Sequence, residues 1–176
     1  MLNFKEILRA LSFAAHAHRA QVRKGTGDPY VNHLIEVAEI LARIAEESDT
    51  EVLSAAVLHD VIEDTSVSAA EVEKWFGPRV LKLVESLSDD KTLPQVDRKR
   101  LQIEHMHCAT DEVRRIKLAD LCSNVSATPA DWPRNRQIEY LDWSERVAEA
   151  CSGAHPALEH EYQARLKHMR ILLGDA

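Results

Sequence analysis

The sequence has little of what marks secreted or membrane-spanning proteins. Its 176 residues include three cysteines, Cys108, Cys122 and Cys151, and none has CxxC spacing. An odd, widely spaced set argues against a disulfide framework and for a reducing compartment. No apolar run approaches the roughly 18 residues of a membrane span, and the first residues lack the layout of a signal peptide. We therefore expect a cytoplasmic protein without a membrane span.

An excess of positive charge is also absent, since the formal net charge is −7. An acidic domain repels the phosphate backbone, so no nucleic acid partner is expected. A small anionic ligand remains compatible with this balance, because it needs only a few local cations. The length fits one domain, and we assign residues 1–176 to it.

The apolar residues recur with helical spacing almost throughout, and no sustained alternating strand pattern is present. Capping boxes are predicted at Ser48 to Glu51 and Ser68 to Glu71, with Gly77 as a helix stop. The sequence predicts an all-α bundle, in which the glycine-rich run 24–29 leaves room for one short β-hairpin. Helices are expected over residues 4–22, 31–47, 52–62, 78–87, 94–107, 111–125, 133–151 and 156–173.

The pair His59-Asp60 ends a segment, 52–58, that is apolar nearly all round and is therefore expected to be central and buried. An isolated His-Asp pair more often caps a helix end in solvent. Here, however, Glu63 and Asp64 follow one helical turn later, forming i,i+4 pairs if the helix continues. Carboxylates placed side by side are unfavourable without a cation, which would satisfy them together with the imidazole.

Two other segments carry the same kinds of side chain. Asp120 ends a mostly apolar stretch with Asn124 one turn later, and His33 opens the second helix. Two imidazoles and two carboxylates without a thiolate favour a borderline-to-hard ion with open positions over a structural zinc. We expect one divalent metal and take it to be Mn²⁺, although ligand chemistry alone does not separate manganese from iron or magnesium.

These residues stand in stretches that resemble the small alarmone hydrolases, single-domain relatives of the hydrolase half of RelA/SpoT enzymes, and above all the metazoan SpoT homologue type. The resemblance runs in family order from about residue 4 to residue 160. The matching stretches are Arg23-Lys24 with 27–33, 55–65, 89–94 with 98–102, 117–120 with Asn124, and Thr128-Pro129 with Trp132 and Glu139-Tyr140. The implied fold is a single-domain, HD-type helical bundle, with no synthetase or regulatory domain.

The resemblance also implies roles for individual residues. The metal ligands would be His33, His59, Asp60 and Asp120. The catalytic group would be Glu63 and Asp64, which would orient and deprotonate the attacking water, and Asn124, which would help to hold the substrate. The substrate-binding residues would be Arg23 against the purine base, Arg136 and Tyr140 at the border of the nucleotide pocket, and Lys24 and Lys117 near the phosphates.

The implied reaction is metal-dependent removal of pyrophosphate from the ribose 3′ position of the small-molecule nucleotide (p)ppGpp, which returns GDP or GTP. Two alternatives remain open. The same site could act on (p)ppApp or on the 2′-phosphate of NADPH, because stacking on Arg23 tolerates either purine. The protein could also be a non-catalytic nucleotide-binding sensor. The sequence does not set the oligomeric state.

Three positions depart from the family pattern. Leu34 stands where relatives usually have proline, Gln95 replaces a frequent lysine, and Ser126 occupies a position where an arginine is common. The last two changes remove possible anion contacts and leave the expected metal ligands complete. The tryptophans Trp75, Trp132 and Trp143 are expected to be core anchors.

Overall fold

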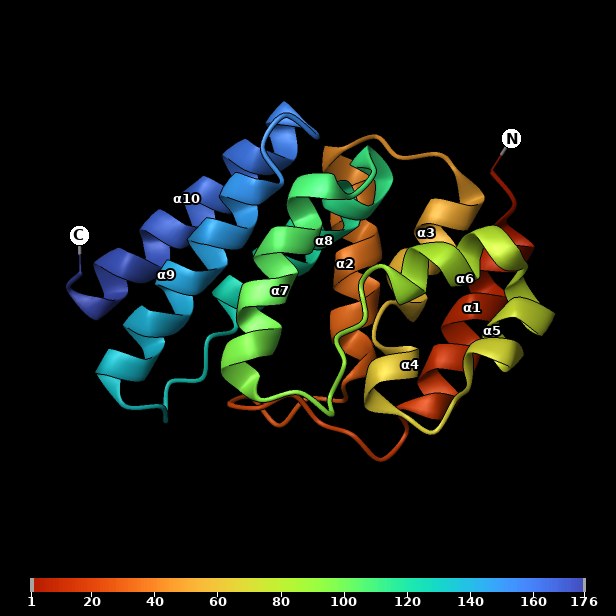
Figure 1. The fold of residues 1–176 in the computed structure, drawn as a ribbon, viewed down its shortest axis with the longest axis horizontal. Helices are drawn as coiled ribbons and strands as arrows, with labels where there is room; N and C mark the ends of the chain where they lie inside the picture. The colour runs from red at the N-terminus through yellow and green to blue at the C-terminus, as the bar shows by residue number, and fades with distance from the viewer. Residues whose placement is uncertain (1, 176) are drawn as a thin grey trace.

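The chain is folded into helices that surround a shared apolar core, as the ribbon in Figure 1 shows. This computed structural model describes residues 2–175. The helices are α1 (Phe4–Ala17), α2 (Val31–Ile44), α3 (Thr50–Leu58), α4 (Val61–Asp64), α5 (Ala69–Phe76), α6 (Pro78–Glu85), α7 (Gln95–Cys108), α8 (Asp111–Ser126), α9 (Arg134–Ala150) and α10 (Pro156–Leu173). The expected all-α class is confirmed.

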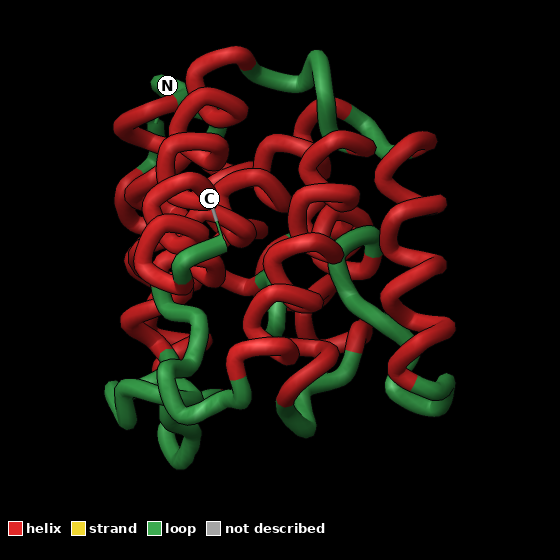
Figure 2. Tube along the Cα trace, turned by 90° about the vertical axis from the view of Figure 1, so that its left-hand side faces the viewer, coloured by secondary structure: helices red, strands yellow, loops and turns green. Residues whose placement is uncertain are grey.

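The short hairpin allowed around the glycine-rich run is reduced to a single antiparallel bridge between Val22 and Pro29. Figure 2 accordingly shows only helices and loops in the described part of the chain. Across residues 2–175, no helix is long and apolar enough to cross a membrane.

Helix α3 is central because its sequence has no polar face. Every residue from Val52 to Leu58 is buried, and the helix packs against α1, α2 and α6. Helix α2 contacts α3 on one side and α8 on the other. Figure 1 shows α2 near the middle, with α1, α3, α5 and α6 to one side and α9 and α10 to the other. Side chains on α2, α3 and α8 can therefore meet.

The expected continuous helix over residues 52–62 is wrong. Helix α3 ends at Leu58, His59 and Asp60 form a turn, and α4 begins at Val61. Asp60 leaves α-helical geometry, with φ of −98° and ψ of −2°, and its carboxylate accepts a hydrogen bond from Tyr30 before α2. The pairs His59/Glu63 and Asp60/Asp64 were expected to lie one turn apart on a single helix. They instead span the break between α3 and α4.

Local signals placed most of the other helix ends. Ser68 forms the predicted capping box with Glu71, and α10 has the expected bounds. The box at Ser48 is wrong, because Asp49 is the N-cap of α3 and accepts a hydrogen bond from the Glu51 amide at 2.9 Å. Helices α1 and α2 end at Ala17 and Ile44, several residues before the expected ends.

Three connections lie at the same end of the bundle, along the lower edge of Figures 1 and 2. They precede α2, α7 and α9. This clustering places the loop residues that follow α1, α6 and α8 around one region of the surface.

Gly77 joins α5 to α6 with φ of +88° and ψ of 166°, a conformation open essentially only to glycine. We predict that Gly77→Ala lowers the free energy of unfolding by about 1–3 kcal/mol, measured by urea denaturation. The matched control is Gly174→Ala, because Gly174 has a left-handed conformation near the C-terminus and an added Cβ meets open space at both positions. Equal effects of the two substitutions would contradict the backbone explanation.

Candidate functional site

The four expected metal ligands converge where α2, α3 and α8 meet. His33 projects from α2, His59 and Asp60 form the turn after α3, and Asp120 lies on α8. The Nε2 atom of His33 lies 3.2 Å from Asp120 Oδ1 and 3.7 Å from Asp60 Oδ2. The Nε2 atom of His59 lies 3.1 Å from Asp60 Oδ2 and 3.6 Å from Asp120 Oδ1. Donor atoms from all four residues thus face one small region.

The two imidazoles present their Nε2 atoms to this region because their other ring nitrogens are occupied. His59 Nδ1 lies 2.8 Å from the Ala56 carbonyl oxygen, and His33 Nδ1 lies 2.8 Å from Ser123 Oγ. A carbonyl only accepts, so His59 carries a proton on Nδ1, and in the neutral form of the ring the lone pair is on Nε2. That buried Nε2 has no hydrogen-bond partner of acceptable geometry, despite the nearby Asp60.

A divalent cation fits this arrangement. Buried polar atoms are nearly always paired, and a lone pair aimed at carboxylates invites a cation between them. Nitrogen and oxygen ligands about 2.0–2.2 Å from one ion lie roughly 3 Å or slightly more from each other. Ligand atoms of His33, His59 and Asp60 lie within 4.8 Å of one another, and Asp120 adds a fourth at the separations given above.

Both carboxylates are held in the charged form. Burial alone would raise the pKa of Asp60, but the neighbouring His59 and His33 outweigh it and lower that pKa. Burial also opposes ionisation of Asp120, yet the neighbouring charge of Lys117 holds its pKa well below the usual range. Two charged carboxylates with unshared electron pairs are what a hard cation requires.

Three further side chains orient these carboxylates. Tyr30 donates its hydroxyl proton to Asp60 Oδ2 at 2.6 Å, Lys117 Nζ donates to Asp120 Oδ2 at 3.0 Å, and Asn124 Nδ2 donates to Asp120 Oδ1 at 2.5 Å. Lys117 is only 7% exposed. Sequence reasoning assigned it to the substrate and gave no role to Tyr30. The only indication in the sequence that Tyr30 contributes to the site is its position three residues before the expected ligand His33.

The expected catalytic carboxylates lie on α4, next to the loop before α7. Glu63 Oε2 accepts a hydrogen bond from the Asp89 amide at 2.8 Å, and burial raises the pKa of Glu63 to about 6. Asp64 forms an ion pair with Lys91 from the same loop. Gln21 Nε2 donates to the Asp64 carbonyl oxygen at 2.6 Å.

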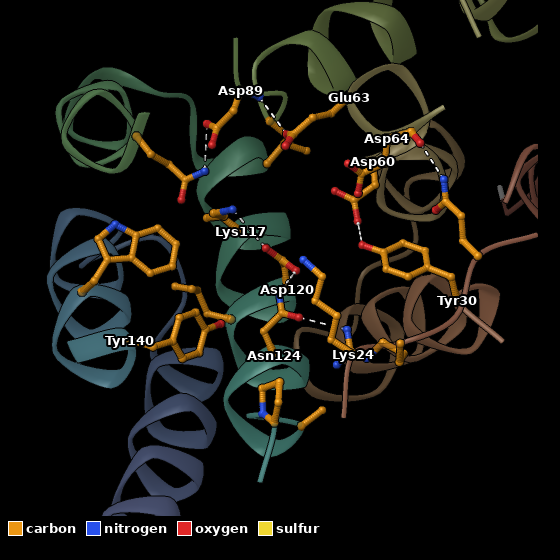
Figure 3. A pocket seen from close by; sticks show the side chains of 18 of the residues that line it. Lys24, Tyr30, Asp60, Glu63, Asp64, Asp89, Lys117, Asp120, Asn124 and Tyr140 are labelled. Atoms are coloured by element: carbon orange, nitrogen blue, oxygen red, sulfur yellow. Dashed lines mark hydrogen bonds and ion pairs between the residues drawn. The ribbon is translucent and has the colours of Figure 1, made fainter. Parts of the chain in front are cut away.

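These groups open into a cavity of about 600 Å³. Its wall contains nine of the twelve expected site residues, from loops and helices far apart in the sequence (Figure 3). They are Arg23, Lys24, Asp60, Glu63, Asp64, Lys117, Asp120, Asn124 and Tyr140. His33 and His59 are buried and do not line the cavity, but they reach its edge through Asp60 and Asp120.

Cations and aromatic rings face each other across this cavity. Arg23 Nη1 donates to Asn124 Oδ1 at 2.9 Å, and Lys24 points into the space from the glycine-rich loop (Figure 3). Tyr140 lies on the other side of the cavity from Lys24 (Figure 3), and its ring contacts those of Trp132 and Trp143, which also line the cavity. Trp143 packs against the apolar core as expected and also lines the cavity, whereas Trp75 is exposed, so the core-anchor expectation is wrong for Trp75.

The twelfth residue, Arg136, lines a neighbouring cavity of about 440 Å³ that shares Trp132 and Tyr140 with the first. Its guanidinium carbon lies 4.0 Å from the centre of the Trp132 ring. Arg136 thus stands beside the main cavity without lining it.

Comparison with known proteins agrees with this arrangement. A family model described as HD domain matches residues 10–137. The mouse (Mus musculus) protein named guanosine-3′,5′-bis(diphosphate) 3′-pyrophosphohydrolase MESH1 is 43% identical over 159 residues, 88% of this chain and 89% of that protein. The human (Homo sapiens) protein of the same name is 43% identical over 169 residues, 93% and 92% of the two chains.

A solved structure of a metazoan ortholog of SpoT, described as hydrolysing ppGpp and playing a role in starvation responses, is also similar. It matches with a TM-score of 0.87 and 39% sequence identity, and the match covers 97% of each chain.

We predict that Asp60→Ala abolishes tight binding of Mn²⁺, measured by isothermal titration of the metal-free protein. Losing a direct ligand should weaken affinity by more than the roughly 10–100-fold that loss of an outer hydrogen bond costs. Asp90→Ala is the control, because Asp90 is exposed and its carboxylate contacts only Thr92. Equal Mn²⁺ affinity in the two variants would exclude Asp60 as a ligand.

Proposed function

The chain belongs to the HD domain family, and on that premise we propose that it is a metal-dependent phosphohydrolase acting on guanosine 3′,5′-bis(diphosphate) and its pentaphosphate. Water would add across the bond between the ribose 3′ oxygen and phosphorus, leaving GDP or GTP and releasing pyrophosphate. One observation carries the proposal: His33, His59, Asp60 and Asp120 converge beside Glu63 and Asp64.

We assign His33, His59, Asp60 and Asp120 as ligands of one divalent cation, with Mn²⁺ as the expected ion. The support is the donor set of two imidazole nitrogens and two carboxylates. When bound, such an ion lowers the pKa of water in contact with it and shields the negative charge of a phosphate. Tyr30, Lys117 and Asn124 keep the two carboxylates turned toward this position.

Glu63 and Asp64 are assigned to the attacking water. A pKa of about 6 leaves Glu63 mostly ionised at neutral pH and still basic enough to accept a proton. Asp64 lies on the same short helix and would hold the water in line with the phosphorus atom. Its ion pair with the exposed Lys91 also brings a cation to the edge of the reaction site.

The remaining wall of the cavity is assigned to the nucleotide. Arg23 offers a planar guanidinium for stacking on the purine, and Asn124 holds that guanidinium in place. Lys24 faces the phosphates, and Tyr140 closes the aromatic side. Arg136 would reach the far end of the substrate from the adjoining cavity.

The decisive experiment is product analysis with Mn²⁺-loaded protein. Guanosine 3′,5′-bis(diphosphate) should yield GDP and pyrophosphate in equal amounts. A panel at equal metal concentration should include the adenosine counterpart and NADPH. If the protein leaves the guanosine compound intact while cleaving another nucleotide, the substrate assignment is wrong. Tight binding of the panel without turnover would identify a non-catalytic sensor.

We predict that Glu63→Gln lowers kcat by about 10²- to 10⁴-fold, because the amide no longer accepts the proton of the attacking water. KM and Mn²⁺ affinity should change little, since Glu63 is assigned to neither metal nor nucleotide. Initial-rate kinetics of pyrophosphate release measure the effect. Glu73→Gln is the control, because Glu73 is exposed on α5. Unchanged turnover in Glu63→Gln would remove this residue from the mechanism.

Three wider assignments stay predictions. They are a single hydrolase domain over residues 1–176, a cytoplasmic location, and the absence of a nucleic acid partner.

A further inference from the structure

His33 differs from His59 in what holds the second ring nitrogen. His59 Nδ1 donates to a backbone carbonyl, which no side-chain change removes. His33 Nδ1 instead meets the hydroxyl of Ser123, a fully buried residue of α8, at 2.8 Å. The orientation of His33 therefore depends on one side chain.

The Ser123 hydroxyl continues to a carboxylate. Its Oγ donates to Oε2 of Glu36 at 2.7 Å. Glu36 lies one helical turn after His33 on α2, so Ser123 bridges two residues of the same helix. Arg23 Nη2 lies 3.4 Å from Ser123 Oγ and is a further hydrogen-bond donor to this hydroxyl oxygen.

These contacts settle which way the protons point. An ionised Glu36 only accepts, so the single proton of Ser123 Oγ goes to Glu36. The lone pairs of Ser123 Oγ are then left to accept, and His33 must donate from Nδ1. His33 thus has its lone pair on Nε2, which faces Asp60 and Asp120.

Arg165 of α10 holds Glu36, the last residue in the series of hydrogen bonds that runs from His33 through Ser123. Its Nη1 atom donates to Glu36 Oε1 and to the Cys122 carbonyl oxygen, each at 3.2 Å. The guanidinium therefore ties the Glu36 carboxylate to the backbone of α8 beside Ser123. With Oε1 held by Arg165, Oε2 remains turned toward the serine.

We infer that Ser123 and Glu36 are positioning residues that fix the tautomer and ring orientation of His33 and thereby set the affinity of the site for its divalent cation. The inference rests on the proposed role of His33 as a metal ligand. Outer hydrogen bonds of this kind change metal affinity by about 10–100-fold when they are removed. Here the Glu36 carboxylate does not contact His33 directly but orients it through the hydroxyl of Ser123.

The test is Mn²⁺ titration of the metal-free protein, with affinities compared among wild type, Ser123→Ala and Glu36→Ala. Ser123→Ala should raise the dissociation constant by about 10–100-fold, and Glu36→Ala should raise it in the same direction. The urea midpoint of each metal-free variant should stay close to that of the wild type. Turnover at saturating Mn²⁺ should recover, because the ligand itself is retained.

Glu39→Ala is the matched control. Glu39 is on the same helix and carries the same charge, but its carboxylate pairs with Arg43 and not with Ser123. Its loss should leave Mn²⁺ affinity near the wild-type value. Wild-type affinity in both Ser123→Ala and Glu36→Ala would overturn the inference, as would equal weakening by Glu39→Ala.

His33→Ala separates this inference from the function on which it rests. If His33→Ala loses Mn²⁺ while Ser123→Ala and Glu36→Ala both keep it, only the positioning role fails. If His33→Ala also binds Mn²⁺ as the wild type does, the proposed metal site itself is wrong.

Discussion

Two charged carboxylates lie beside two buried imidazoles, and the architecture around the cavity is arranged to keep them there. Asp60 and Asp120 come from segments 60 residues apart and would repel each other without compensation. Helix α2 contacts both α3 and α8, so the backbone that carries His33 also brings the two acids together. Donors from Tyr30 and Lys117 occupy one oxygen of each acid. Asp60 Oδ2, the oxygen bonded to Tyr30, and Asp120 Oδ1 face the Nε2 atoms of the two imidazoles.

The metal site could be predicted from the sequence because the ionisable pair His59-Asp60 directly follows an apolar segment that is expected to be buried. Sequence reasoning placed His59 and Asp60 correctly after the buried segment, because burial of residues 52–58 follows from their composition. It did not foresee that the helix breaks there, because neither glycine nor proline marks residues 58–61 and the partner of Asp60 is distant in the sequence. The role of Tyr30 was hidden for the same reason, because its partner Asp60 is 30 residues away.

Departures from the family pattern illustrate the same limit. The sequence shows that Ser126 stands where relatives commonly have an arginine. It does not show which other cation lies near this position in the fold. Ser126 Oγ lies 3.3 Å from Arg165, which arrives from α10 and also contacts Glu36. A cation is thus present near this part of α8, yet it serves the carboxylate behind His33. Only the packing of α10 against α8 shows where that charge is directed.

The burial of Lys117 has a consequence for the charge balance of the core. Its ammonium group compensates Asp120 inside the core, and the phenol of Tyr30 does part of the same work for Asp60. The core therefore supplies a counter-ion for Asp120 from the chain itself, in contrast to zinc fingers, whose ligands depend on the metal and which remain unfolded without it.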